Sequence, residues 1–113
     1  MEANKIIITG GATRIGAAIA EKLSGPGKEI VIHFNKSSSK AEKLKKELSK
    51  NNTKVYLVKG DLSVEKDVKK ILKFAKSKLK YFDCLINNAS LFENDKLKNF
   101  TTDSWGKHLR TNL

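Results

Sequence analysis

The stretch TGGATRIG (residues 9–16) decides the fold, because it joins a β-branched run to a helical pattern through three glycines. The run before it, KIIIT (residues 5–9), is typical of a buried parallel strand. The residues after it predict a helix, with apolar side chains three and four apart on its buried face: Ile15, Ala18, Ile19 and Leu23. A glycine turn of this kind lets the backbone approach a pyrophosphate, which the N–H groups at the helix start can bind.

Strands and helices are predicted to alternate along the rest of the chain. Three more strands are expected at EIVIHF (residues 29–34), KVYLVKGDL (residues 54–62, running into a loop) and FDCLINNAS (residues 82–90, with a polar end). This alternation predicts an α/β fold, a Rossmann-like doubly wound parallel sheet of which the chain carries about four strands. Residues 1–113 are expected to form part of one such domain.

The helices between these strands have recognisable ends and apolar faces. SGPGK (residues 24–28) ends the first helix, because glycine and proline break helices. The serines of NKSSSK (residues 35–40) are expected to cap the second helix and Ser63 the third. The predicted buried residues are Ala41, Leu44 and Leu48 in the second helix, and Val64, Val68, Ile71, Leu72, Ala75 and Leu79 in the third. A last helix is expected from about residue 101 to the end.

The composition argues against several classes of function. The formal net charge is +11, but 21 of the 23 cationic residues are lysines spread along the predicted helices. Nucleic-acid sites favour arginine and aromatic platforms, so no nucleic-acid partner is expected, although a lysine-driven binding module stays an alternative. Cys84 is the single cysteine, which suits a reducing, cytoplasmic compartment. No apolar run approaches the ~20 residues of a membrane helix, and two histidines and one cysteine, far apart, predict no metal site.

Four motifs in order resemble the short-chain dehydrogenases/reductases. TGGATRIG is similar to the family's Thr-Gly-x-x-x-Gly-x-Gly turn, and Arg14 replaces the middle glycine, as is characteristic of the pteridine reductase branch. GDL (residues 60–62) resembles the family's adenine-binding loop. NNAS (residues 87–90) resembles the Asn-Asn-Ala-Gly motif, with the serine of pteridine reductases. RTNL places Asn112 at the family's helix asparagine.

The resemblance implies a role for each of these residues. Cofactor binding is expected at Gly10, Arg14, Ile15 and Gly16 in the turn, at Asp61 and Leu62 beside the adenine, and at Asn88, Ala89 and Ser90 beside the nicotinamide ribose. Ser90 and Phe92 are expected to contact a pteridine substrate. Asn112 is expected to be catalytic, since the asparagine at this place in the family holds a water of the proton relay.

The region after the second strand predicts which cofactor is bound. Sites specific for NAD place an Asp or Glu about 20 residues past the glycine turn to hold the ribose 2′-hydroxyl. Here HFNKSSSK (residues 33–40) contains no carboxylate. Arg14, Asn35, Lys36 and Ser37 would instead bind a 2′-phosphate, so NADP(H) is the expected cofactor. The alternative is that Lys36 is one more surface lysine and Arg14 a solvent-facing residue at the helix start.

The family's catalytic Tyr-x-x-x-Lys pair is absent, since Gly60 follows Tyr56 and Leu85 follows Tyr81 at that spacing. We therefore expect the N-terminal, NADP-binding part of a reductase, without its C-terminal catalytic part and inactive alone. The resemblance implies hydride transfer to a carbonyl or imine of a small molecule, with a pteridine as one candidate substrate. It also implies that the full-length enzyme is a homotetramer. Other short-chain reductases, of 3-oxoacyl or sugar substrates, and a non-catalytic nucleotide-binding module are the alternatives.

Overall fold

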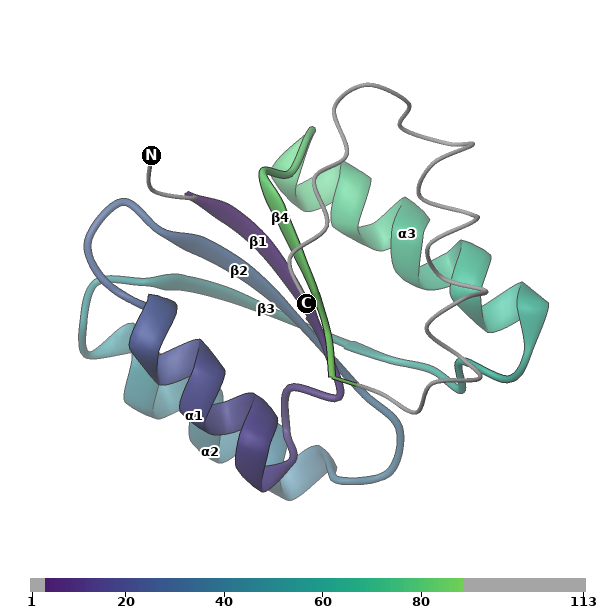
Figure 1. The fold of residues 1–113 in the computed structure, drawn as a ribbon, viewed down its shortest axis with the longest axis horizontal. Helices are drawn as coiled ribbons and strands as arrows, with labels where there is room; N and C mark the ends of the chain where they lie inside the picture. The colour runs from purple at the N-terminus through teal and green to yellow at the C-terminus, as the bar shows by residue number, and fades with distance from the viewer. Residues whose placement is uncertain (1–3, 89–113) are drawn as a thin grey trace.

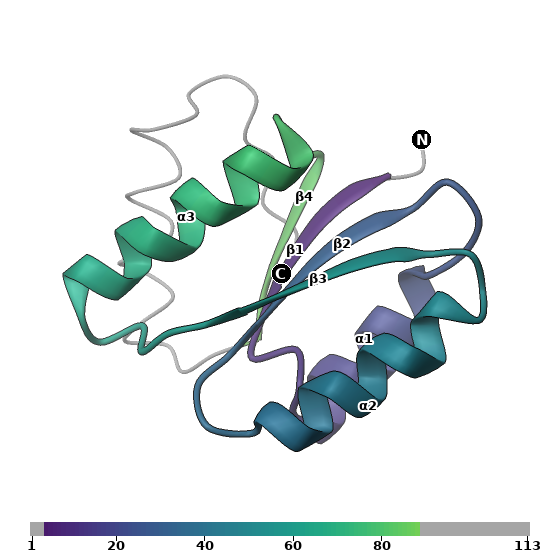
Figure 2. The same ribbon diagram turned by 180° about the vertical axis from the view of Figure 1, so that it is seen from behind.

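Four parallel strands form a single sheet in the computed structural model, which describes residues 4–88. They are β1 (Lys5–Thr9), β2 (Glu29–Phe34), β3 (Lys54–Lys59) and β4 (Cys84–Asn87), in the order β3-β2-β1-β4. α1 (Arg14–Leu23) and α2 (Ser38–Ser49) cover one face, and α3 (Glu65–Leu79) covers the other (Figures 1 and 2). The predicted doubly wound α/β fold is confirmed. The predicted last helix lies outside the described residues.

Burial on both faces explains why the strands are continuous apolar runs. Successive side chains alternate between the two faces, so that neighbours in sequence enter different cores. Ile7, Val31 and Leu85 pack in the cluster that contains the buried face of α3. Ile6 and Ile30 pack in the opposite cluster, with residues of α1 and α2.

The buried face of α1 differs from the prediction. Gly16 and Ala20 are its buried residues, whereas Ile15 is 66% exposed and Ala18 is also exposed. Small residues bring this helix close to the sheet. Ile15 and Ala18 instead line an open apolar groove with Ile86 of β4, the strand at the edge of the described sheet. The helix was therefore predicted correctly, but the prediction that Ile15 and Ala18 are buried was wrong.

The predicted serine caps are confirmed only in position for α2, where Ser37 is the N-cap residue, and are wrong for α3. α3 begins after Val64, and Ser63 instead donates its N–H and hydroxyl to Asp61 Oδ1 at 2.9 and 2.7 Å. Ser37 precedes α2, but its side chain makes no capping hydrogen bond. At Ser63 the nearby Asp61 carboxylate takes the hydroxyl that a helix cap would need. The predicted buried residues of α2 are confirmed, as are those of α3 except Val64, which is 42% exposed.

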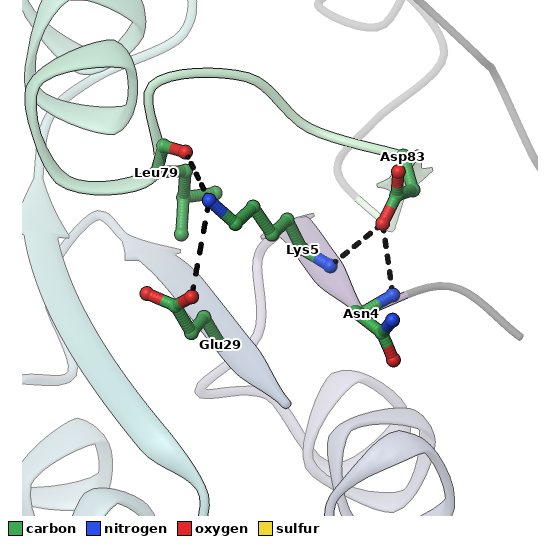
Figure 3. Close-up of polar contacts among 5 residues, drawn as sticks. All are labelled: Asn4, Lys5, Glu29, Leu79 and Asp83. Carbon is green, nitrogen blue, oxygen red and sulfur yellow. Dashed lines mark hydrogen bonds and ion pairs between the residues drawn. The ribbon is translucent and has the colours of Figure 1, made fainter. Parts of the chain in front are cut away.

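Asp83 and Lys5 join the start of β1 to the chain before β4 (Figure 3). Asp83 Oδ2 accepts the backbone N–H groups of Asn4 and Lys5, at 2.9 and 3.0 Å. Lys5 Nζ donates to the carbonyl of Leu79 at 2.9 Å and lies 3.9 Å from a carboxylate oxygen of Glu29. These contacts hold the amino ends of the strands together. They thereby help to fix the register of the strands, which continues to the carboxyl edge of the sheet.

Replacing Asp83 with alanine should lower the free energy of unfolding by about 2 kcal/mol, because two backbone donors lose a charged acceptor. Urea unfolding followed by circular dichroism measures this. Asp83→Asn keeps one oxygen acceptor and should lose less than half as much. Equal losses in the two variants would show that the charge, and not the hydrogen-bond geometry, matters here.

No helix within residues 4–88 is long and apolar enough to cross a membrane.

Candidate cofactor site

The carboxyl ends of the strands surround a cleft of about 480 Å³. The sheet order reverses at β1, whose neighbours are β2 and β4, and open α/β sheets bind ligands at such a switch point. The cleft is lined by parts of the glycine turn, by the end of β2 and the residues that follow it (33–37), by Leu62 and by Asn88. Segments far apart in the sequence are thus brought together at one edge.

The glycine turn after β1 is held by the end of β4. Gly10 has a φ of +63°, a left-handed conformation that glycine adopts without strain. The Asn88 side-chain amide donates to the Gly10 carbonyl at 3.1 Å and to the Thr13 hydroxyl at 2.8 Å. The Asn88 backbone N–H donates to Thr9 Oγ1 at 3.0 Å. Asn88 therefore fixes the turn from the neighbouring strand.

The start of α1 offers backbone donors to an anion. Thr13 caps this helix, because its hydroxyl accepts the N–H of Gly16 at 3.1 Å. The N–H groups of Arg14 and Ile15 have no acceptor inside the helix, since they belong to its first turn. That turn contains no acidic residue, so the positive end of the helix dipole is not neutralised. Both features favour a bound phosphate.

Gly16 packs directly against the glycine turn and the Asn88 side chain. A Cβ built there would contact the Gly10 carbonyl oxygen and would lie 2.7 Å from Gly11 Cα and 2.9 Å from Asn88 Nδ2. Only a residue without a side chain lets α1 begin so close to the turn. The predicted turn residues Gly10 and Gly16 are thus required by the geometry of the loop.

The predicted 2′-phosphate residues are only partly brought together. Asn35, Lys36 and Ser37 line the cleft with the glycine turn. Arg14 does not line it, but lies in an adjoining hollow between α1 and α2, together with Lys40. Thr13 and Ala12 border both the cleft and this hollow. Cationic side chains therefore lie on two sides of the start of α1, Lys36 in the cleft and Arg14 and Lys40 in the hollow.

Leu62 and Asp61 form the loop after β3. Leu62 is buried and lines the cleft. Hydrogen bonds from the Ser63 hydroxyl and then from its backbone N–H lower the pKa of the Asp61 carboxyl, and the charge of Lys36 lowers it further. Asp61 is therefore an ionised acceptor, and its own N–H donates to Asp67 Oδ2 at 2.8 Å.

Two residues of this edge were not singled out as site residues by the sequence. His33 lines the cleft and is hydrogen-bonded to the glycine turn. Asn87 has both polar atoms of its side chain buried without a hydrogen-bond partner. The signal for both was their position, as polar residues at the carboxyl ends of apolar strands. Ala89, Ser90, Phe92 and Asn112 lie outside the described residues, and within residues 4–88 no three potential metal ligands are grouped.

Comparisons with known proteins agree with this arrangement. The short-chain dehydrogenase/reductase FrzI from Cladobotryum sp is 31% identical over 107 residues, which make up 95% of this chain and 42% of that protein. FolM alternative dihydrofolate reductase 1 from Brucella suis, crystallised in complex with NADP, is 28% identical with a TM-score of 0.78, over 95% of this chain and 50% of that one. The FolM structure from Brucella canis, also complexed with NADP, is 36% identical with a TM-score of 0.65, over 77% of this chain and 35% of that one.

The chain spans less than half the length of the curated relatives that it matches. The family model for short chain dehydrogenases matches residues 4–113, which is nearly the whole chain. The glycine turn, the strand order and the asparagine at the end of β4 are where the sequence motifs require them. The chain belongs to the short-chain dehydrogenase family.

Proposed function

We propose that the chain binds NADP(H) for a reductase that transfers hydride to a carbonyl or imine. The observation that carries this proposal is the lining of the cleft, where Lys36, Asn35 and Ser37 lie next to the glycine turn. No carboxylate occurs between Val31 and Lys40, where an NAD site would hold the ribose 2′-hydroxyl. A 2′-phosphate gains from a cation and hydroxyl donors at this place.

The donor set fits the rest of the cofactor as well. A pyrophosphate would meet the N–H groups of Arg14 and Ile15 at the start of α1, where Gly16 lets the helix begin close to the turn. The adenine would lie against Leu62, with Asp61 as acceptor at the edge. When bound, the nicotinamide supplies hydride. The NADP complexes of the two FolM relatives support this choice of cofactor.

Lys36→Asp tests the cofactor preference. This change replaces an attractive charge by a repulsive one, so NADPH affinity should fall about 10- to 100-fold while NADH affinity changes little. Isothermal calorimetry with both cofactors on the 113-residue chain measures the two affinities. Lys73→Asp, on an exposed position of α3, makes the same change of net charge and should leave both affinities unaltered. An unchanged preference in Lys36→Asp would refute the 2′-phosphate role of Lys36.

For the substrate we propose a small molecule, with a pteridine as the first candidate. The support is the sequence NNASLF (residues 87–92), whose Ser90 and Phe92 have the spacing of the pteridine reductase branch. An aromatic ring in this place would stack on a flat bicyclic substrate. Inhibition of the full-length enzyme by antifolate-like pteridines would support this substrate, whereas a 3-oxoacyl or sugar reductase would not be inhibited.

We also propose that the full-length protein is a cytoplasmic homotetramer that needs neither nucleic acid nor membrane. Its lysines are dispersed along the helices, and its single cysteine is buried. Binding to DNA or RNA that falls steeply with salt would contradict this and would favour the nucleic-acid alternative. Analytical ultracentrifugation of the full-length protein tests the assembly.

A further inference from the structure

His33 connects two segments of the cleft that are far apart in the sequence. Its side chain lies near the carboxyl end of β2 and is 3% exposed. The Gly10 backbone N–H donates to Nδ1 at 3.0 Å, and Nε2 lies 2.7 Å from the Gly60 carbonyl oxygen. One imidazole therefore spans from the turn after β1 to the loop after β3.

The partners determine the protonation of this ring. A backbone N–H can only donate, so Nδ1 must carry no proton where it faces Gly10. A carbonyl oxygen can only accept, so Nε2 must carry the proton that faces Gly60. The geometry fits the neutral imidazole with its proton on Nε2, and neither of the other two forms of the ring satisfies both contacts.

Each partner of His33 stands next to a different part of the cleft. Gly10 begins the glycine turn, and the His33 carbonyl also accepts the N–H of Gly11 at 3.0 Å. Gly60 directly precedes Asp61 and Leu62 in the loop after β3. Since β2 separates β1 from β3 in the sheet, the turn and the loop share no strand pairing. The β2 backbone reaches both, since the Phe34 carbonyl accepts the Gly60 N–H at 3.0 Å, and the His33 ring is the side chain that links them directly.

We propose that His33 is a positioning residue for the dinucleotide. This inference rests on the proposed NADP(H) function. The ring holds the pyrophosphate end of the cleft, at Gly10, in register with the adenine end, at Leu62. A ligand that contacts both ends needs this register, whereas a ligand that occupies the adenine end alone needs it much less. His33 does not itself touch the reacting atoms.

Three substitutions separate the two contacts. His33→Asn keeps an acceptor near the place of Nδ1, and His33→Gln keeps a donor near the place of Nε2. His33→Leu keeps neither. Each variant breaks at least one link, so each should bind NADPH about tenfold more weakly. The affinity for adenosine 2′-phosphate, which lacks both the pyrophosphate and the nicotinamide half, should change less than about twofold.

The experiment is calorimetric titration of the wild-type chain and the three variants with both ligands. Nitrogen-15 NMR of the histidine ring in the wild type adds a readout that needs no ligand, and urea unfolding identifies variants that are folded. Support requires a proton on Nε2 only, together with a loss confined to NADPH.

Several outcomes overturn the inference. A proton on Nδ1 in the wild type contradicts the deduced contacts, even if no variant folds. Folded variants that keep their NADPH affinity, or that lose both ligands equally, show that the ring does not set the register. If the wild type binds neither ligand, the proposed function itself fails, and this result is distinct because it appears before any substitution is made.

Discussion

Replacing Gly16 with alanine is expected to abolish NADPH binding and to destabilise the chain by about 3 kcal/mol. The added Cβ would meet the Gly10 carbonyl oxygen and Gly11 Cα, which are backbone atoms of the turn itself. Neither can rotate away as a side chain could, so α1 or the turn has to shift. Alanine gains roughly 1 kcal/mol over glycine inside a helix, which is too little to offset this clash. The displaced turn would no longer aim its N–H groups at a phosphate.

Gly27→Ala is the matched control for this prediction. Gly27 has a φ of +82°, but no atom lies within 4 Å of a Cβ built there. The same substitution should therefore cost only the backbone strain of about 1 kcal/mol and leave NADPH affinity unchanged. Thermal unfolding and NADPH titration of both variants measure the contrast. Normal NADPH binding by Gly16→Ala would refute the role given to the close contact between Gly16 and the turn.

Ile7→Ala is expected to lower the free energy of unfolding by about 2–5 kcal/mol, the usual cost of a large-to-small change in a core. Ile7 is fully buried in β1 and packs in the cluster of α3. A domain is stable by only about 5–15 kcal/mol, so this loss removes a large part of its stability. The urea midpoint of the variant measures it.

Ile15→Ala deletes the same atoms from an exposed position of α1. Ile15 is 66% exposed, so the expected loss is within about 0.5 kcal/mol. The pair tests the burial of α1 directly, because the sequence pattern placed Ile15 on the buried face. A loss at Ile15 as large as that at Ile7 would show that the groove beside Ile86 is covered in solution.

The sequence predicted the sheet well, because each strand is buried on two faces and its composition shows this directly. The range of β2 and the buried residues of α2 agree with the structure. The side chains of Ile15 and Ser63 do not agree, since each depends on neighbours that are distant in the chain or compete locally. A helical period shows that a helix has an apolar side, but the packing partner decides how much of that side is covered.

The candidate site was predictable where a motif encodes backbone geometry. Gly10, Gly16 and Asn88 were found in this way and lie together around the turn. His33 was not, because a histidine at a strand end predicts burial as readily as a specific hydrogen bond. Its role depends on Gly60, 27 residues away, and on the order of the strands. Such contacts are a property of the topology and are not visible in local spacing.

The strand order also sets the sequence of events during synthesis. Thr9 and Asn88 meet across 79 residues, so the turn cannot be completed until the end of β4 has left the ribosome. At about 5–20 residues per second this interval lasts roughly 4–16 s. In that time β1 has an unpaired edge on the side that β4 later occupies, and such edges invite pairing with other chains. The nascent protein thus exposes this edge of β1 until β4 is made, and the turn is completed only after this period.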